Sequence, residues 1–466
     1  MIEKIYQMGK ISNRGSVLPV YIWNFYHKLY EAKIRGTEMK DYQPESYLLY
    51  DRPYNVRIRI ELKESVDGKL LSEAANRVIK RYPYFSVCVT VNKEGKYVIE
   101  PNHRPFVVSE TKTPNFALGS EEVNFHMASI DYTENIIFFN VSHSLAGASG
   151  IMPWVKSVLY QYIAEKYRVS LDASGIHLPD SELLPGETAF PVFEDLPDVE
   201  PFSQYKGGSG YFLTQDYREA AQNPGSGGNG YYCLEMQQAE LMKYVRANDA
   251  SPGTIISVFM FKALDSLFSP EIPVITCGMA HNFRDLAGCP NTYEDLTRTL
   301  HIKYTRDMAD WSMEKLGTIT RGMVMLQSQA ENAICDLKKL IEYHNQIDSF
   351  PTLEKKREFC RTQGKFIGAV RDTFNVSYVG RSDWGSLEAY MKSVYTVTNG
   401  HLNVEINSCN DKFFLCFHQV VDNKGYFEAF RKVLDEEGIS YQVTGFFERN
   451  LPGTQLPVED TKQKQS

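Results

Sequence analysis

The 466-residue sequence predicts an α/β protein with mixed sheets, built from two similar halves. Three observations lead to this class. The chain opens with a strand, helix and strand alternation, a segment centred on one histidine occurs twice, and glycine-rich stretches lie between the two copies. A hydrophobic content of 43% is enough to fill a sizeable core.

The first elements follow from changes in hydrophobic period. Residues 54–62, YNVRIRIEL, alternate apolar and polar side chains, which is the pattern of a half-buried strand. From 66 onward the apolar residues recur at helical spacing, and Pro83 ends that run. Residues 85–91 alternate again. The N-terminal half therefore begins as strand, helix and strand.

Glycine-rich stretches at 206–210 and 223–230 cannot lie inside regular elements, so they mark a crossover at the surface. The polar end of the chain is expected to fray. These signals predict four segments: an N-terminal lobe over 1–185, a crossover over 186–235, a C-terminal lobe over 236–456 and a frayed tail over 457–466.

The second half also alternates helix and strand. Ser251 and Pro252 form a helix start, and an apolar helix is expected after them. Residues 271–283, EIPVITCGMAHNF, have the pattern of a buried strand. Residues 312–347 are expected to be mainly helical.

The repeat relates the two halves. Aligned without gaps, residues 138–159 and 413–434 share six identical positions, and these include His143 with His418. Both copies have the order aromatic strand, histidine, glycine-containing turn and amphipathic helix. We therefore expect the two segments to form equivalent strand–turn–helix units.

Composition excludes several classes of function. A net charge of −8 and a pI near 5.8 argue against a general nucleic-acid or anionic-membrane surface. The chain has no signal-peptide pattern and no apolar run of membrane-spanning length, so a cytoplasmic protein is expected. The eight cysteines are scattered and show no metal spacing, and no glycine-rich nucleotide motif supports ATP or NAD binding.

His143, in NVSHSLAGASG, allows two interpretations. Side-chain alternation puts it on the apolar face of its strand with Phe139 and Val141, where a buried structural histidine would fit. Alternatively, burial favours the neutral imidazole, which can accept a proton near pH 7. Ser142 faces the other side of the strand, which argues against a Ser–His nucleophilic pair.

These features together resemble the chloramphenicol acetyltransferase-like acyltransferases, which include condensation domains and alcohol acetyltransferase-like proteins. Their signature is His-x-x-x-Asp-Gly after a strand, and His143 matches its histidine. KRYPYFSVCV resembles the family's helix-to-strand segment, and Asn282-Phe283-Arg284 resembles its N-x-R segment. The motif is degenerate here: Gly147 stands for the aspartate, Ala148 for the glycine and Ser142 for an optional first histidine.

The resemblance implies two similar lobes with a channel between them. It also implies transfer of an acyl group from coenzyme A, or from the pantetheine arm of an acyl carrier protein, to a small-molecule hydroxyl or amine, with His143 as general base. No permanently bound cofactor or metal is implied. A catalytically degenerate relative that binds a ligand or partner in the channel is the alternative, because Gly147 and Ala148 have lost the Asp-Gly pair.

Other site residues follow from the same resemblance. In the family the motif aspartate pairs with an arginine, so Arg284 needs another carboxylate, Asp285 or Asp383, or a backbone carbonyl. Gly147→Asp is expected to restore the missing carboxylate. The candidate channel-lining residues are Ser142, His281, Asn282, Ser377, Tyr378 and His418.

Overall fold

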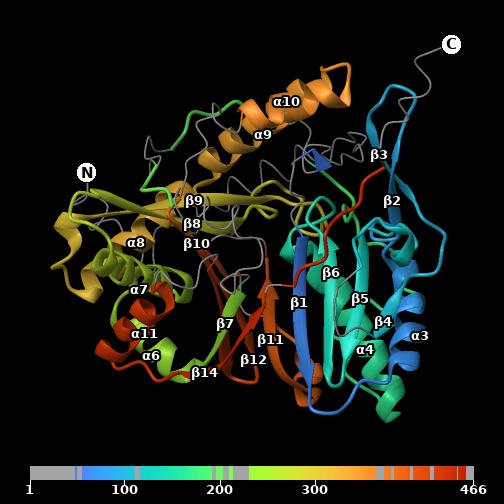
Figure 1. Cartoon of the computed structure of the whole chain (residues 1–466), viewed down its shortest axis with the longest axis horizontal. Coiled ribbons are helices and arrows are strands. Elements are labelled where there is room, and N and C mark those ends of the chain that lie inside the picture. The colour runs from blue at the N-terminus through green and yellow to red at the C-terminus, as the bar shows by residue number, and fades with distance from the viewer. Residues whose placement is uncertain are drawn as a thin grey trace.

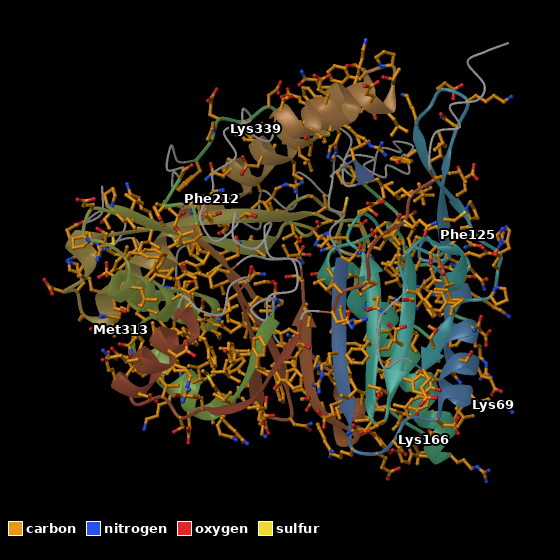
Figure 2. The ribbon with its side chains drawn as sticks, in the orientation of Figure 1. Lys69, Phe125, Lys166, Phe212, Met313 and Lys339 are labelled. Atoms are coloured by element: carbon orange, nitrogen blue, oxygen red, sulfur yellow. The ribbon has the colours of Figure 1, made fainter. Side chains whose placement is uncertain are left out.

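The computed structural model describes residues 48–49, 55–110, 116–190, 196–202, 209–213, 230–363, 372–378, 382–398, 402–419, 425–448 and 450–457. These residues form two lobes that lie side by side, each with its own sheet and its own helices (Figure 1). Exposed lysines such as Lys69 of α3 and Lys339 of α9 lie on the outer surfaces (Figure 2). None of the helices in these ranges is both long and apolar enough to cross a membrane.

The first sheet has the strand order β11-β1-β6-β5-β4. Its strands are β1 (Asn55–Leu62), β4 (Val108–Glu110), β5 (Ala128–Thr133), β6 (Ile136–Ser142) and β11 (Met391–Val397). Helices α3 (Gly68–Val78) and α4 (Ala148–Tyr167) pack against each other in the same lobe, and β2 (Val87–Val91) pairs with β3 (Tyr97–Pro101) in a separate hairpin.

The second sheet has the order β14-β7-β13-β12-β10-β8-β9. Its strands are β7 (Gly230–Gln237), β8 (Val274–Asn282), β9 (Thr297–Thr305), β10 (Phe374–Tyr378), β12 (Leu402–Cys409), β13 (Lys412–Gln419) and β14 (Gln442–Glu448). The helices of this half are α6 (Gln238–Ala247), α7 (Pro252–Leu267), α8 (Met313–Gln327), α9 (Ala330–Asp348), α10 (Leu353–Gln363) and α11 (Tyr426–Glu436).

The helix stop before Pro83 and the helix start at Ser251 are found at their expected places, and the structure adds a cap at Asp67. Asp67 caps α3 by accepting a hydrogen bond from the Leu70 amide, and a 3-10 turn at Ile79–Arg81 completes the helix before Pro83. Ser251 forms a capping box with Thr254 at the start of α7. These caps satisfy amide groups that the first turn of a helix leaves without partners, which explains why the helices begin there.

The two copies of the repeat share a strand followed by a helix, and residues 420–424 between strand and helix of the second copy lie outside the described residues. Residues 138–159 cover most of β6 and the first part of α4, and residues 413–434 cover β13 and most of α11. Both central strands lie between two antiparallel neighbours. The copies differ at the histidine, since β6 ends before His143 whereas β13 still includes His418.

The sheets do not divide the chain at one point. β7 begins at Gly230, inside the expected crossover, and β11 comes from the second half of the chain but pairs with β1 in the first sheet. The segment 450–457 also returns to the first lobe, where the Asn55 side chain donates to the Pro452 carbonyl at 2.7 Å. Within the expected crossover, residues 191–195, 203–208 and 214–229 lie outside the described residues, and so does the tail after 457.

Two large cores hold the lobes. One lies around β1, β6, α3 and α4, and the other lies between the second sheet and helices α7, α8 and α11. The first core also includes Tyr231, Cys233, Phe414 and Cys416 of β7 and β13. The lobes are therefore packed together along these strands by buried side chains.

Candidate functional site

His143 lies in the turn between β6 and α4. Because β6 ends at Ser142, side-chain alternation does not set the direction of the His143 ring. The expectation that His143 shares a strand face with Phe139 and Val141 is therefore corrected. Its side chain is 22% exposed, and Nδ1 lies 3.5 Å from Oδ2 of Asp295, just before β9. The imidazole thus faces a carboxylate from the second half of the chain.

Asp295 is nearly buried, with a side chain 9% exposed. The Thr297 amide donates to its Oδ1 at 3.0 Å. Burial raises the pKa of Asp295, but His143, Arg298 and the hydrogen bonds from Thr297 together hold it below its usual value. The carboxylate is therefore ionised near neutral pH, next to the imidazole.

This arrangement favours one form of the imidazole. A carboxylate facing Nδ1 favours the tautomer with the proton on Nδ1, so that the lone pair lies on Nε2. An imidazole in this form can accept a proton through Nε2. His143 and Asp295 together therefore have the arrangement that a general base with an orienting carboxylate requires.

Arg284 organises the segment that leads to Asp295. Its side chain is buried and donates to the carbonyl oxygens of Thr292 at 2.8 Å, Tyr293 at 3.3 Å and Glu294. Burial lowers its pKa, and nearby acidic side chains, Asp295 first, oppose that shift. The guanidinium thus pairs with backbone carbonyls, one of the two kinds of partner expected for it.

The suggested carboxylate partners of Arg284 need correction. Asp285 contributes only through its charge, while the carbonyl of Asp383 accepts a hydrogen bond from Lys156 of α4. Asn282 is the side chain that contacts Arg284 directly, since its Oδ1 accepts from the Arg284 amide at 3.0 Å and from Nη1 at 3.2 Å.

The other candidate lining residues lie within their own sheets or cores. Ser142 is buried and shares a 2.7 Å hydrogen bond with the Ser144 hydroxyl, and the His281 ring meets Phe283 edge-on at 5.1 Å. Burial lowers the pKa of His281.

The remaining three candidates belong to the second sheet. Ser377 hydrogen-bonds the buried carboxyl of Glu405, and Tyr378 packs on the second core. His418 is fully buried with its ring 5.7 Å from Tyr231, a setting typical of a core histidine.

A second histidine–carboxylate pair was missed by sequence reasoning. His301 Nδ1 lies 2.9 Å from Asp372 Oδ2, and the histidine side chain is 20% exposed. Gln327 exchanges hydrogen bonds with both the amide and the carbonyl of His301. His301 follows Thr297 by four residues on β9, so roughly 13 Å of strand separates them. The pair resembles the His143 pair in geometry but lies apart from it.

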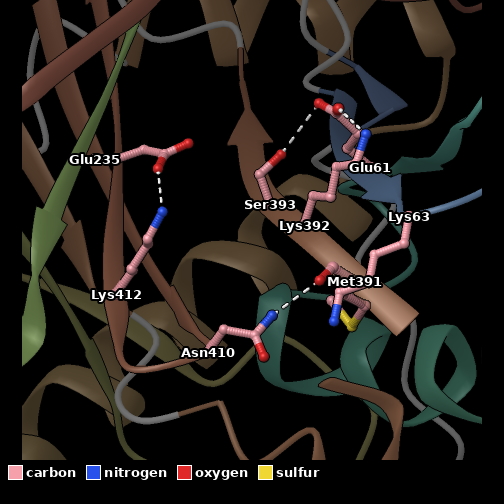
Figure 3. A pocket seen from close by; sticks show the side chains of 8 residues that line it. All are labelled: Glu61, Lys63, Glu235, Met391, Lys392, Ser393, Asn410 and Lys412. Carbon is pink, nitrogen blue, oxygen red and sulfur yellow. Dashed lines mark hydrogen bonds and ion pairs between the residues drawn. The ribbon is translucent and has the colours of Figure 1, made fainter. Parts of the chain in front are cut away.

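Figure 3 shows the side chains that line a hollow of about 540 Å³. This hollow lies at the opposite end of the first sheet from His143. Within the β1–β6 ladder, Glu61 pairs with Ile136 while Asn55 pairs with Ser142, so roughly 20 Å of strand separates the hollow from the histidine. Its charges are balanced locally, because Glu235 contacts Lys412 at 2.7 Å. This hollow is not the site around His143.

A second hollow, of about 560 Å³, lies between α3 and the β2–β3 hairpin. Its lining includes Lys80, His103 and Arg104 and no carboxylate. Such side chains suit phosphate groups. Within the described ranges, no cluster of three His, Cys, Asp or Glu side chains could hold a metal ion.

Solved structures with the same arrangement include a complex with coenzyme A and a condensation domain. TRI101 of F. graminearum, complexed with coenzyme A and T-2 mycotoxin, aligns with a TM-score of 0.53 and 10% identity over 87% of this chain and 99% of that chain. The first condensation domain of the CDA synthetase aligns with a TM-score of 0.51 and 11% identity over 88% and 93%. This chain has their fold.

A third solved structure has the same fold as the first two. Polyketide synthase associated protein 5 from Mycobacterium tuberculosis aligns with a TM-score of 0.50 and 11% identity over 85% of this chain and 96% of that chain. The predicted α/β class with two sheets is thereby confirmed, and at these identities the likeness extends to the fold alone. No family model matches the chain, and no curated protein matches its sequence.

Proposed function

We propose that this protein transfers an acyl group from a thioester to a hydroxyl or amine, with His143 as the general base. The observation that carries the proposal is the partly exposed His143 ring facing the ionised Asp295 directly after a central strand. The fold supports it, because TRI101 of the same fold was solved with coenzyme A bound and another structure of this fold is a condensation domain.

The proposed reaction needs one proton carrier. Nε2 of His143 accepts the proton of the acceptor hydroxyl or amine as its oxygen or nitrogen attacks the thioester carbonyl carbon. The carbon–sulfur bond then breaks, and the thiolate takes the proton from the imidazolium. The products are an ester or amide and a free thiol, and no covalent acyl-enzyme forms.

Coenzyme A or a carrier-bound pantetheine is the proposed donor. The second hollow, which is lined by Lys80, His103 and Arg104 and is called the basic hollow below, lies close to the His143 turn. The Met127 amide donates to the Val87 carbonyl, and the Ser142 amide donates to the Met127 carbonyl. Two strand spacings of roughly 4.8 Å thus separate Val87 from Ser142. We propose that Lys80 and Arg104 in this hollow bind the donor's phosphates.

His143→Ala and His301→Ala test the role of the histidine. Both remove a partly exposed imidazole that faces a carboxylate, yet only His143 lies in the motif turn. With acyl-coenzyme A and a panel of alcohols and amines, thiol release by His143→Ala should fall roughly 10²–10⁴-fold, while His301→Ala keeps its rate. Equal loss in both variants would contradict the proposal.

The alternative is a binding protein that has lost catalysis. Gly147 and Ala148 favour it, since they stand where the motif has its Asp-Gly pair. Wild-type protein that binds coenzyme A in calorimetry but releases no thiol with any acceptor would support this alternative over acyl transfer.

A further inference from the structure

Gly147 leaves room for a carboxylate from another element. Its backbone angles of φ −81° and ψ 172° suit any residue, so conformation does not require a glycine. A Cβ at this position would lie 2.5 Å from Oδ1 and 3.0 Å from Cγ of Asp295. The space beside the motif position is therefore already filled by the Asp295 carboxylate.

A second glycine of the same turn makes the approach possible. A Cβ at Gly150 would lie 2.0 Å from the carbonyl oxygen of Tyr293, which is a backbone atom that cannot rotate away. The first turn of α4 and the segment 292–297 are thus in direct contact. Arg284 donates hydrogen bonds to the carbonyls of that segment, including the Tyr293 carbonyl.

The first lobe also holds the segment. The Tyr293 ring stacks on Tyr84 with centroids 4.0 Å apart, and the Tyr293 amide donates to the Glu187 carbonyl. Glu187 in turn forms a buried 2.8 Å ion pair with Arg81. These contacts fix the segment relative to α4 and to the His143 turn.

We infer that Asp295 is a positioning residue for His143 and takes over the place of the motif carboxylate that Gly147 lacks. The inference rests on the proposed function for its catalytic consequence. Asp295 orients the imidazole and keeps the proton on Nδ1, and Gly147 and Gly150 provide the space for this contact. The histidine comes from one lobe and its orienting carboxylate from the segment before β9.

This inference reverses the effect expected for Gly147→Asp. The new side chain would collide with Asp295 and bring a second carboxylate against it, so the variant should lose activity. Removing the Asp295 side chain as well frees that space. Gly147→Asp combined with Asp295→Ala should therefore be at least tenfold more active than Gly147→Asp alone.

Nitrogen-15 NMR spectra of protein labelled at its histidine rings test the positioning of His143 by Asp295 directly. They require no catalytic turnover. In wild type the neutral His143 ring should be protonated at Nδ1. In Asp295→Ala the Nε2-protonated form should appear, while the matched variant Asp372→Ala should change His301 and leave His143 as it was. His143→Ala identifies the signal.

Kinetics supply the second measurement. Asp295→Ala should lower kcat about 10²-fold with little change in KM, as expected for a misplaced base. If Asp295→Ala does not fold, Asp295→Asn keeps the size of the side chain and should still shift the tautomer. An unchanged His143 spectrum in these variants would overturn the positioning role even in an active enzyme. A shifted His143 spectrum in a protein without turnover would support the positioning role of Asp295. That outcome would refute only the proposed acyl transfer.

Discussion

Arg284→Ala removes the guanidinium that holds the segment carrying Asp295. The variant leaves the carbonyls of Thr292, Tyr293 and Glu294 without this buried donor. A hydrogen bond to a charged group contributes about 1.5–3 kcal/mol, and each buried acceptor left without a partner costs about 1–3 kcal/mol. We expect the free energy of unfolding to fall by about 3–5 kcal/mol, since the three bonds are not additive.

Arg306→Ala is the matched control. Arg306 also donates to several backbone carbonyls, at Asp265, Phe268, Ser269 and Ile272, but it lies beyond the far end of β9 and its side chain is 30% exposed. Its loss should cost about 1–3 kcal/mol. Both variants are measured by urea unfolding at pH 7, and thiol release is then assayed where each is folded.

Only Arg284→Ala should lose thiol release while folded, because only Arg284 contacts the segment that carries Asp295. An Arg284→Ala protein within about 1 kcal/mol of wild type would show that the guanidinium does not hold this segment. Equal activity in the folded Arg284→Ala and Arg306→Ala proteins would refute the link from Arg284 to the histidine.

Two further predictions concern the second sheet and the basic hollow. Burial raises the pKa of Glu405 above its usual value of 4.5, although hydrogen bonds from residues that include Thr398 and Asn403 lower it. Since the fold favours the neutral carboxyl, the free energy of unfolding falls as the pH rises from 4.5 through the pKa of the folded state. Glu405→Gln should gain stability over wild type in urea unfolding at pH 7 and none below pH 4.5; a constant difference would contradict this. Replacing Lys80 and Arg104 by Glu should raise KM for acyl-coenzyme A but not for an acyl-cysteamine thioester without phosphates; equal effects would exclude phosphate binding.

The sequence predicted those parts of the fold that depend on local pattern. The strand β1 and the cap at Ser251 depend on neighbouring residues, and both were found. The half-buried character expected for β1 was wrong, because Arg57 and Arg59 on its polar face are buried as well. The histidine repeat was recognised because its two strand–helix units keep the same order of residue types. The pairing of β11 with β1 was not predicted, because a strand pattern does not specify a partner more than 300 residues away.

The candidate site was predicted only in part. His143 was singled out from its motif, and the cost of an unpaired buried charge predicted either a carboxylate or a backbone carbonyl as the partner of Arg284. Asp295 was missed because its contact with His143 depends on how the segment before β9 packs on α4. Gly147 carried the available signal, since a missing motif carboxylate suggests a replacement, and Asp295 follows the N-x-R segment by about ten residues.

The position of β11 late in the sequence affects how the first sheet folds during synthesis of the chain. During synthesis β1 has no partner on one side until Met391–Val397 emerge, about 330 residues later. At 5–20 residues per second this takes roughly 15–65 s, during which an open strand edge can pair with another chain. Nascent chains truncated before Met391 should therefore aggregate or require a chaperone, whereas chains that include Val397 can close the first sheet.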